Sequence, residues 1–212
     1  SGFRKEKINY ISLGINSKNI INKKELNKNP EKYFLFVGRI IERKGLSWFA
    51  ETILKEFNDY SLKVVGPIID QLEFSKAISN KNIEYLGVVS EDELFNLRQN
   101  ATAAVVPNIY LEDDNDFEAF CFVTIESIAA GTIIVASNYQ GIADALQNGK
   151  IGFLPEPSNK ESWISTLNDV VRMNEEEREI YIKEGINFLS DELSWDNLFQ
   201  ETEDLYFGLI KK

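Results

Sequence analysis

The strongest constraint on the fold is a regular alternation of short apolar runs with longer, more polar stretches after residue 32. The apolar runs are rich in β-branched side chains, and most are apolar throughout, as strands buried on both faces must be. We predict strands at residues 33–40, 62–66, 83–87, 102–107 and 132–137. We predict helices between them at residues 46–57, 70–79, 91–99 and 122–130. Strands and helices that alternate in this way form βαβ units, so the predicted fold is α/β with a doubly wound parallel sheet.

End signals support these helices and add another. Ser90 with Glu93, and Ser158 with Glu161, have the spacing of capping boxes at helix starts. Gly131 stands where a glycine that ends a helix is expected. The signals therefore predict a further helix that begins near residue 158.

The last stretch of the chain predicts a C-terminal helix with Ser194 as its N-cap. Its side chains recur at i, i+3, i+4 and i+7 spacing, which is typical of an amphipathic helix. The stripe consists of Trp195, Leu198, Phe199, Thr202, Leu205, Tyr206, Leu209 and Ile210. We expect it to pack on the sheet of its own domain; the alternative is that part of it covers a surface of another domain.

The first 32 residues differ from the rest of the chain. Residues 8–16 are apolar enough for a short strand, and residues 17–32 are polar and rich in Lys and Asn, which is typical of a linker. We therefore divide the chain into a strand that enters the domain and a polar linker, residues 1–32, and a domain at residues 33–212.

Composition excludes several classes of function. The chain has 23 basic and 34 acidic residues and a net charge of −11, which argues against a nucleic-acid-binding surface. It has no histidine, so it contains no Ser-His or Cys-His couple, and its single cysteine, Cys121, forms no internal disulfide. No apolar run reaches the length of a membrane span, and we expect a cytoplasmic protein.

Ligands of open parallel sheets bind beyond the carboxyl ends of the strands, so the loops there are the candidate sites. After the first predicted strand the sequence reads "GRIIERKG". Gly38 allows the backbone to approach a ligand, Arg39 follows at the end of the strand, and Lys44 stands at the entrance to the next helix, so the two cations could hold an anion. The alternative is that these are solvated loop charges. The loop has neither the G-x-G-x-x-G pattern nor a P-loop, which disfavours a dehydrogenase or a P-loop NTPase.

A second motif, "EAFCFVTIE", follows the fourth predicted strand. Glu118 precedes the next helix and Glu126 lies within it, so the two carboxylates flank amides that attract negative charge. This layout suits a ligand with a central diphosphate and a hydroxyl-bearing sugar at each end. The alternative is that Glu118 caps the helix and Glu126 is merely exposed.

Two further loops hold candidate ligands of the same crevice. Asp114 and Asp116, within the acidic run 112–116, could hold a divalent metal, although we favour a solvated loop. Residues 140–142 open a short helix after the fifth predicted strand, and we expect their amides to be free and to face the crevice.

Taken in order, these motifs resemble the C-terminal, donor-binding domain of GT-B glycosyltransferases, specifically glycosyltransferase family 4 ("group 1"). The resemblance starts near Tyr10 and rests on the segments "ISLGIN", "FVGRIIERKGL", "EAFCFVTIESIAAG" and "SNYQGIADALQNGKIGFL". It implies a Rossmann-like domain, one half of a GT-B fold, that binds a nucleotide sugar. It also implies that the N-terminal, acceptor-binding domain of such enzymes lies outside this chain.

The resemblance also implies roles for individual residues. Arg39 and Lys44 would hold the donor diphosphate, and Glu118 would face the transferred sugar; these three form the expected catalytic set. Glu126 would bind the ribose, and Val88 would lie against the base. Further donor contacts are expected from Gly38, Phe120, Cys121, Val123 and Thr124.

Family enzymes usually retain the anomeric configuration and need no metal, so we expect no cofactor besides the donor substrate. We expect the complete enzyme to transfer a sugar to a glycan or lipid-linked acceptor in polysaccharide biosynthesis, with peripheral association at the inner face of the membrane left open. Two departures stand out: Ala119 and Cys121 replace the usual glycines, and the span 107–118 is long. The alternative hypothesis, from another functional class, is that the chain is a non-catalytic module that binds a partner chain.

Overall fold

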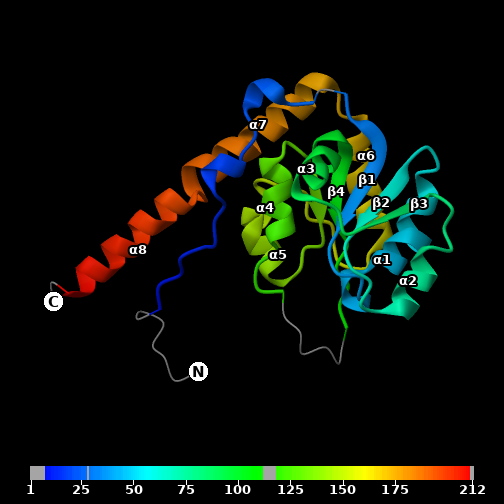
Figure 1. The fold of residues 1–212 in the computed structure, drawn as a ribbon, viewed down its shortest axis with the longest axis horizontal. Helices are drawn as coiled ribbons and strands as arrows, with labels where there is room; N and C mark the ends of the chain where they lie inside the picture. Colours follow the sequence, from blue (N-terminus) through cyan, green and yellow to red (C-terminus); the bar gives the residue numbers. More distant parts are fainter. Residues whose placement is uncertain (1–7, 28, 112–117, 211–212) are drawn as a thin grey trace.

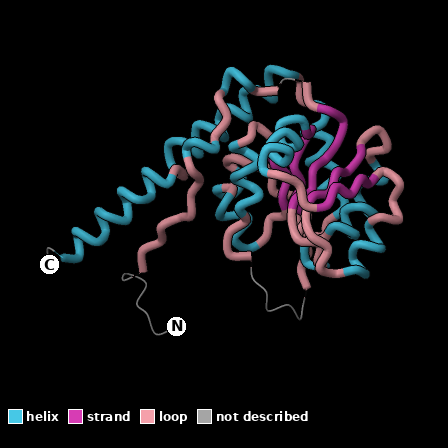
Figure 2. Tube along the Cα trace, in the orientation of Figure 1, coloured by secondary structure: helices cyan, strands magenta, loops and turns pink. Residues whose placement is uncertain are grey.

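The computed structural model of the chain describes residues 8–27, 29–111 and 118–210. Five parallel strands form one sheet in the order β3-β2-β1-β4-β5 (Figures 1 and 2). The strands are β1 (Glu31–Val37), β2 (Ser61–Val65), β3 (Ile83–Gly87), β4 (Ala101–Val106) and β5 (Ile134–Ala136). The chain winds outward from β1 in both directions, so the predicted Rossmann-like doubly wound sheet is confirmed, with its switch point between β1 and β4.

Helices cover both faces of this sheet (Figure 1). They are α1 (Leu46–Trp48), α2 (Gln71–Ala77), α3 (Glu91–Asn100), α4 (Phe122–Ala129), α5 (Gln140–Ala145), α6 (Lys160–Arg172), α7 (Glu175–Glu192) and α8 (Trp195–Ile210). A π-helical turn (Phe49–Ile53) and a 3-10 turn (Leu54–Glu56) extend α1, so the predicted helix at 46–57 is present in an irregular form. Shorter 3-10 turns occur at η2 (Ser17–Asn19), η3 (Lys23–Glu25), η4 (Glu42–Lys44) and η7 (Gln147–Gly149).

Strand β1 shows why the strand sequences are apolar throughout. Phe34 and Phe36 face the larger core, under α1 and α6, whereas Tyr33 and Leu35 face a smaller core under α3. All four side chains are buried, and the Tyr33 hydroxyl donates to the carbonyl of Leu97 at 2.6 Å. Burial on both faces removes the alternation that a half-exposed strand would show.

The helix-end predictions succeed at two positions and fail at one. Ser90 is the N-cap of α3 and accepts from the amide of Glu93, and Gly131 follows α4 with φ +82°. The predicted start at Ser158 is wrong, because Asn159 is the N-cap of α6 and Ser158 takes part in the preceding turn with φ +55°. Asn accepts the N-terminal amides of a helix as well as Ser does, so adjacent candidates compete for the position.

The N-terminal segment packs on the domain at Ile15 and Ile21, whereas Ile8, Tyr10 and Leu13 are exposed. The predicted strand at residues 8–16 is wrong: only Ile15 pairs, in an isolated bridge with Ser194. Within the predicted linker, the buried Ile21 donates its amide to the carbonyl of Ala129 at 2.8 Å. No sheet edge lies beside this segment in the described part of the chain, so its backbone bonds to helix ends instead.

Helix α8 begins at Trp195, directly after the predicted cap Ser194, and extends away from the sheet beside the N-terminal segment (Figure 1). Leu198 is buried, but five other large apolar or aromatic side chains of α8 are exposed to solvent: Trp195, Phe199, Tyr206, Phe207 and Leu209. The expectation that this stripe packs on its own sheet is therefore wrong for most of the helix. Within the described residues, no helix has both the length and the apolar character needed to span a bilayer.

The backbone segments that follow β1 and β2 approach each other closely. Gly66 follows β2 with φ +138°, and a Cβ placed there would lie 2.0 Å from the carbonyl oxygen of Gly38. We predict that Gly66→Ala lowers the free energy of unfolding by roughly 2–4 kcal/mol, because it adds both backbone strain and overlap. Gly208→Ala is the matched control, since a Cβ there meets nothing within 4 Å. Equal urea midpoints for the two variants would contradict the prediction.

Candidate active site

Two loops meet at the carboxyl edge of the sheet, one after β1 and one after β4. Gly45 ends the η4 turn with φ +69°, and a Cβ there would lie 2.0 Å from the carbonyl oxygen of Pro107. The amide of Ile109 donates to the carbonyl of Arg43 at 3.0 Å. Backbone contact thus places the cationic loop against the residues that lead from β4 toward α4.

Glu118 is the centre of the resulting cluster. Its Oε2 accepts from Lys44 Nζ, from Arg43 Nη1 at 2.9 Å and from Asn108 Nδ2 at 3.2 Å. The side chains of Glu118, Arg43 and Lys44 are only 14%, 10% and 14% exposed. The predicted convergence of Lys44 and Glu118 is therefore present in the structure, with Arg43 and Asn108 as additional members.

The start of α5 holds the backbone of Glu118 in place. The amide of Glu118 donates to Gln140 Oε1 at 2.8 Å, and the amide of Gly141 donates to the carbonyl of Glu118 at 3.0 Å. A Cβ at Gly141 would lie 2.0 Å from the carbonyl oxygen of Ala119. The expectation of free amides at residues 140–142 is therefore wrong at Gly141, whose N–H fixes the loop, and at Ile142, whose N–H donates to the carbonyl of Tyr139 at 3.0 Å.

The environment of Glu118 keeps its carboxylate ionised. Burial by itself would raise the pKa, but hydrogen bonds and charges from Lys44 and Arg43 outweigh it and hold the pKa below 4.5. At neutral pH this group can accept hydrogen bonds and carries a full negative charge. It is therefore not the proton donor of an acid–base pair.

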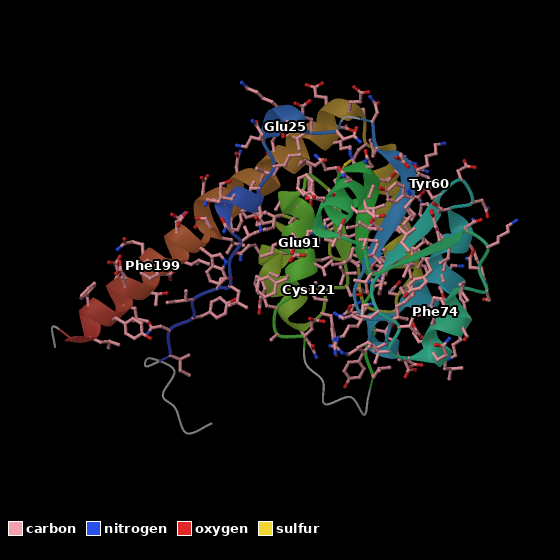
Figure 3. The ribbon with its side chains drawn as sticks, in the orientation of Figure 1. Glu25, Tyr60, Phe74, Glu91, Cys121 and Phe199 are labelled. Carbon is pink, nitrogen blue, oxygen red and sulfur yellow. The ribbon has the colours of Figure 1, made fainter. Side chains whose placement is uncertain are left out.

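Cys121 precedes the first residue of α4 (Figure 3) and belongs to the core cluster between α4 and strands β4 and β5. Its side chain is buried, and burial raises the pKa of the thiol to about 11, with Lys44 opposing and Glu118 adding to the rise. Both the amide and the hydroxyl of Thr124 donate to the carbonyl of Cys121, at 3.0 and 2.6 Å. The pair shapes the start of α4, and the protonated thiol is not a nucleophile.

Glu126 occupies a different environment, near the other side of α4. Its Oε2 accepts from Nη2 of Arg98, which comes from the last turn of α3. A groove of about 500 Å³ opens beside this pair, between α3, α4 and residues 15–25. Its lining includes Lys18, Asn19, Asn22, Glu25, Glu91, Asp92, Phe95, Arg98 and Glu126.

The remaining predicted donor contacts lie around these two clusters. Arg39 is exposed and makes no ion pair within the described residues, and Val88 is 75% exposed at the end of β3. Gly38 donates its amide to the carbonyl of Val65. Phe120 and Val123 are half-buried beside the start of α4. Their contacts with a donor stay predictions, and Asp114 and Asp116 lie outside the described residues.

Sequence reasoning missed four side chains: Arg43, Asn108 and Gln140 around Glu118, and Arg98 beside Glu126. The sequence held a signal only for Arg43, which adjoins Lys44 in the cationic loop. Which of several neighbouring cations turns inward depends on the 3-10 turn at Glu42–Lys44, and the motif does not specify that turn.

The sequence matches the profile of the family Glycosyl transferases group 1 over residues 17–188. The chain belongs to that family. An uncharacterized glycosyltransferase of Methanocaldococcus jannaschii is 29% identical over 209 residues, which cover 95% of this chain and 48% of the relative. A phosphatidyl-myo-inositol mannosyltransferase of Mycobacterium leprae is 29% identical over 182 residues, covering 82% of this chain and 47% of the relative. This group 1 chain thus spans about half the length of these relatives.

Solved structures of glycosyltransferases have the same fold. A glycosyltransferase from Rickettsia africae aligns with a TM-score of 0.78 at 18% identity, covering 99% of this chain and 59% of that one. HepE of Anabaena in complex with UDP aligns with a TM-score of 0.77 at 13% identity, covering 98% of this chain and 59% of that one. The likeness confirms the predicted fold class for this group 1 glycosyltransferase chain.

The lowered pKa of Glu118 gives a testable pH dependence. A carboxylate of this kind stabilises the fold above its unfolded pKa, and the contribution is lost as the pH falls through its folded pKa. We predict that Glu118→Gln lowers the free energy of unfolding by roughly 1–3 kcal/mol at neutral pH. The difference from the parent chain should shrink on acidification below pH 4.5. Urea unfolding at a series of pH values measures it.

Glu56→Gln is the control for this measurement, because Glu56 pairs with Lys160 at the surface and both side chains are 45% exposed. This variant should change stability little at any pH, since solvent screens the pair. If Glu118→Gln and Glu56→Gln gave the same pH profile, the buried cluster would not stabilise the fold.

Proposed function

We propose that this chain is the donor-binding unit of a retaining glycosyltransferase of family 4, with a GT-B architecture when complete. The observation that carries the proposal is the convergence of Lys44 and Arg43 on Glu118 at the start of α4, with Glu126 on the far side of the same helix. Two cations, a helix N-terminus and two flanking carboxylates match a nucleoside diphosphate sugar, which is anionic in the middle and rich in hydroxyls at both ends.

Each group would have a distinct part in the reaction. Lys44, with Arg43 or Arg39, would stabilise the negative charge that develops on the diphosphate as the bond to the sugar breaks. Glu118, ionised at neutral pH, would accept hydrogen bonds from hydroxyls of the transferred sugar near its anomeric carbon. Glu126 would accept from the ribose, and the base would lie against the strand end at Val88.

Glu118 occupies hydrogen-bonding positions that the proposed diphosphate would use. Lys44 and Arg43 both donate to the same carboxylate oxygen, Oε2. An incoming diphosphate would therefore compete with this carboxylate for the two cations, and part of its binding free energy would be spent on that exchange. The exchange would also release Glu118 to contact the sugar.

Donor binding by this unit would not require a metal, because the cations and the helix dipole already neutralise the diphosphate. The competing hypothesis assigns a divalent ion to Asp114 and Asp116. Nucleotide binding that persists in excess EDTA would support the metal-free site, and its loss would favour the metal hypothesis.

The whole enzyme would need more than this chain. The curated relatives are about twice as long, since this chain covers 48% and 47% of two of them. We propose that a second domain supplies the acceptor site and the other wall of the cleft. We also propose that the donor-binding domain begins at residue 33 and that the enzyme is cytoplasmic. Its acceptor would be a glycan or a lipid-linked molecule.

A second candidate is a non-catalytic module that binds a partner chain. The exposed stripe of α8, with Trp195 at 45%, Phe199 at 64% and Tyr206 at 63% exposure, favours it. The two functions predict different results when this chain is combined with the acceptor domain of a relative. Sugar transfer would support the enzyme, whereas stable association without transfer would support the module.

Titration with UDP, GDP and ADP tests the donor site directly. We predict that at least one of these nucleotides binds the chain and shifts amide resonances around Lys44, Glu118 and Glu126. Lys44→Met should weaken that binding by roughly tenfold or more, because it removes a charge-assisted hydrogen bond to phosphate. Glu118→Gln should bind the bare nucleoside diphosphate more tightly than the parent does, because it removes the competing carboxylate. Calorimetry measures both effects.

A matched pair of variants separates the two arginines of the loop. Arg39→Met should weaken nucleotide binding without loss of stability, since Arg39 is exposed, whereas Arg43→Met should lower stability as well. If none of the three nucleotides bound, or if binding left the resonances of Lys44, Glu118 and Glu126 unshifted, the proposed donor site would be wrong.

A further inference from the structure

We propose that Arg98 is a positioning residue that aims the carboxylate of Glu126 at the donor ribose and thereby sets a preference for ribonucleotides over 2′-deoxyribonucleotides. The inference rests on the proposed function, because it assumes that a nucleoside diphosphate binds beside α4. It goes beyond that function by naming a residue of α3, outside both sequence motifs, that determines one element of donor specificity.

The pair joins two separate elements and is buried asymmetrically. Nη2 of Arg98 donates to Oε2 of Glu126, and the Arg98 side chain is 10% exposed while that of Glu126 is 42% exposed. The guanidinium thus lies under the carboxylate, and the carboxylate remains open to the groove that both residues line. By contrast, the side chains of the surface pair Lys160 and Glu56 are equally exposed, so neither partner is a buried support for the other.

Arg98 is itself fixed from below. It lies in the last turn of α3, and its carbonyl accepts from the hydroxyl of the buried Thr132, which follows α4. Its Nε is buried and has no hydrogen-bond partner in the described residues. Burying a guanidinium that is only partly satisfied is unfavourable, and the bond to Glu126 provides a partial offset. The arrangement therefore favours one orientation of the carboxylate.

Within the described residues, Arg98 is the only partner that holds the Glu126 carboxylate. A glutamate side chain has several rotamers. Without a partner it would lose this rotamer freedom only on ligand binding, and the lost entropy would weaken that binding. Arg98 uses one carboxylate oxygen, Oε2, while the carboxylate keeps acceptor positions on both oxygens. A vicinal diol such as that of ribose can donate to these positions, and a 2′-deoxyribose lacks one of the two donors.

The test compares UDP, GDP and ADP with their 2′-deoxy counterparts on the 212-residue chain, with affinities measured by calorimetry. The parent chain should prefer the ribonucleotide by roughly tenfold or more, as expected for a hydrogen bond to a charged acceptor. Arg98→Met should reduce this preference to about that of Glu126→Gln. The double variant should be no worse than Glu126→Gln alone, because the arginine acts through the glutamate.

Arg178→Met is the matched control. Arg178 is also buried, but it lies on α7, and its Nη2 donates to the carbonyl of Ala101 at 3.0 Å rather than to a carboxylate of the donor site. This variant should keep the ribonucleotide preference of the parent chain even if it lowers stability. Should Arg98→Met fail to fold, Arg98→Gln replaces it; its side chain is neutral, so the charge-assisted hydrogen bond to Glu126 is lost and the preference should fall there too.

A folded Arg98→Met or Arg98→Gln chain with the full preference of the parent would overturn the positioning role. Additive losses in the double variant would overturn it as well. If the parent chain binds none of the ribonucleotides, the proposed function fails and the inference fails with it. If the parent binds ribo- and deoxyribonucleotides equally, the donor site stands and only the ribose role assigned to Arg98 and Glu126 is lost.

Discussion

The interaction on which the candidate site depends is the buried carboxylate of Glu118. Its side chain binds Lys44 and Arg43 from the loop after β1 and Asn108 from the loop after β4, while its backbone bonds to the start of α5. One residue therefore connects three of the loops that leave the carboxyl edge of the sheet. The connection is electrostatic, because two partly buried cations in an acidic protein need a nearby anion.

The same cluster shows how two partly buried cations are held in the fold. One internal carboxylate pairs with both of them, so each cation has an anionic partner within the cluster. In the proposed function, a diphosphate would compete with Glu118 for the same cations, and the freed carboxylate would contact the sugar. Glu126 differs, because it is held by Arg98 from a neighbouring helix and its carboxylate stays open to the groove. The two acids of one motif thus have opposite surroundings.

Much of the fold could be predicted because its strands are buried on both faces, which leaves a strong local signal. Four of the five predicted strands deviate by only a few residues at their ends, and β3 matches its predicted limits of 83–87. The errors occur where local signals were ambiguous. Residues 8–16 have an apolar pattern but no neighbouring strand, and Ser158 lies next to an equally good cap, Asn159. In the site, Lys44 and Glu118 were predictable from their motifs, whereas Asn108 and Arg98 come from segments without a motif.

The sequence by itself determined the class of fold, the family and the two acids of the motif, because strand burial and loop position follow from local order along the chain. Only the tertiary structure decided which groups these acids contact. Arg43 rather than Arg39 turns toward Glu118 because the loop closes in a 3-10 turn against Pro107. Arg98 meets Glu126 because the last turn of α3 ends close to α4. Such contacts join residues that are far apart in sequence, so the spacing of residues along the chain does not predict them.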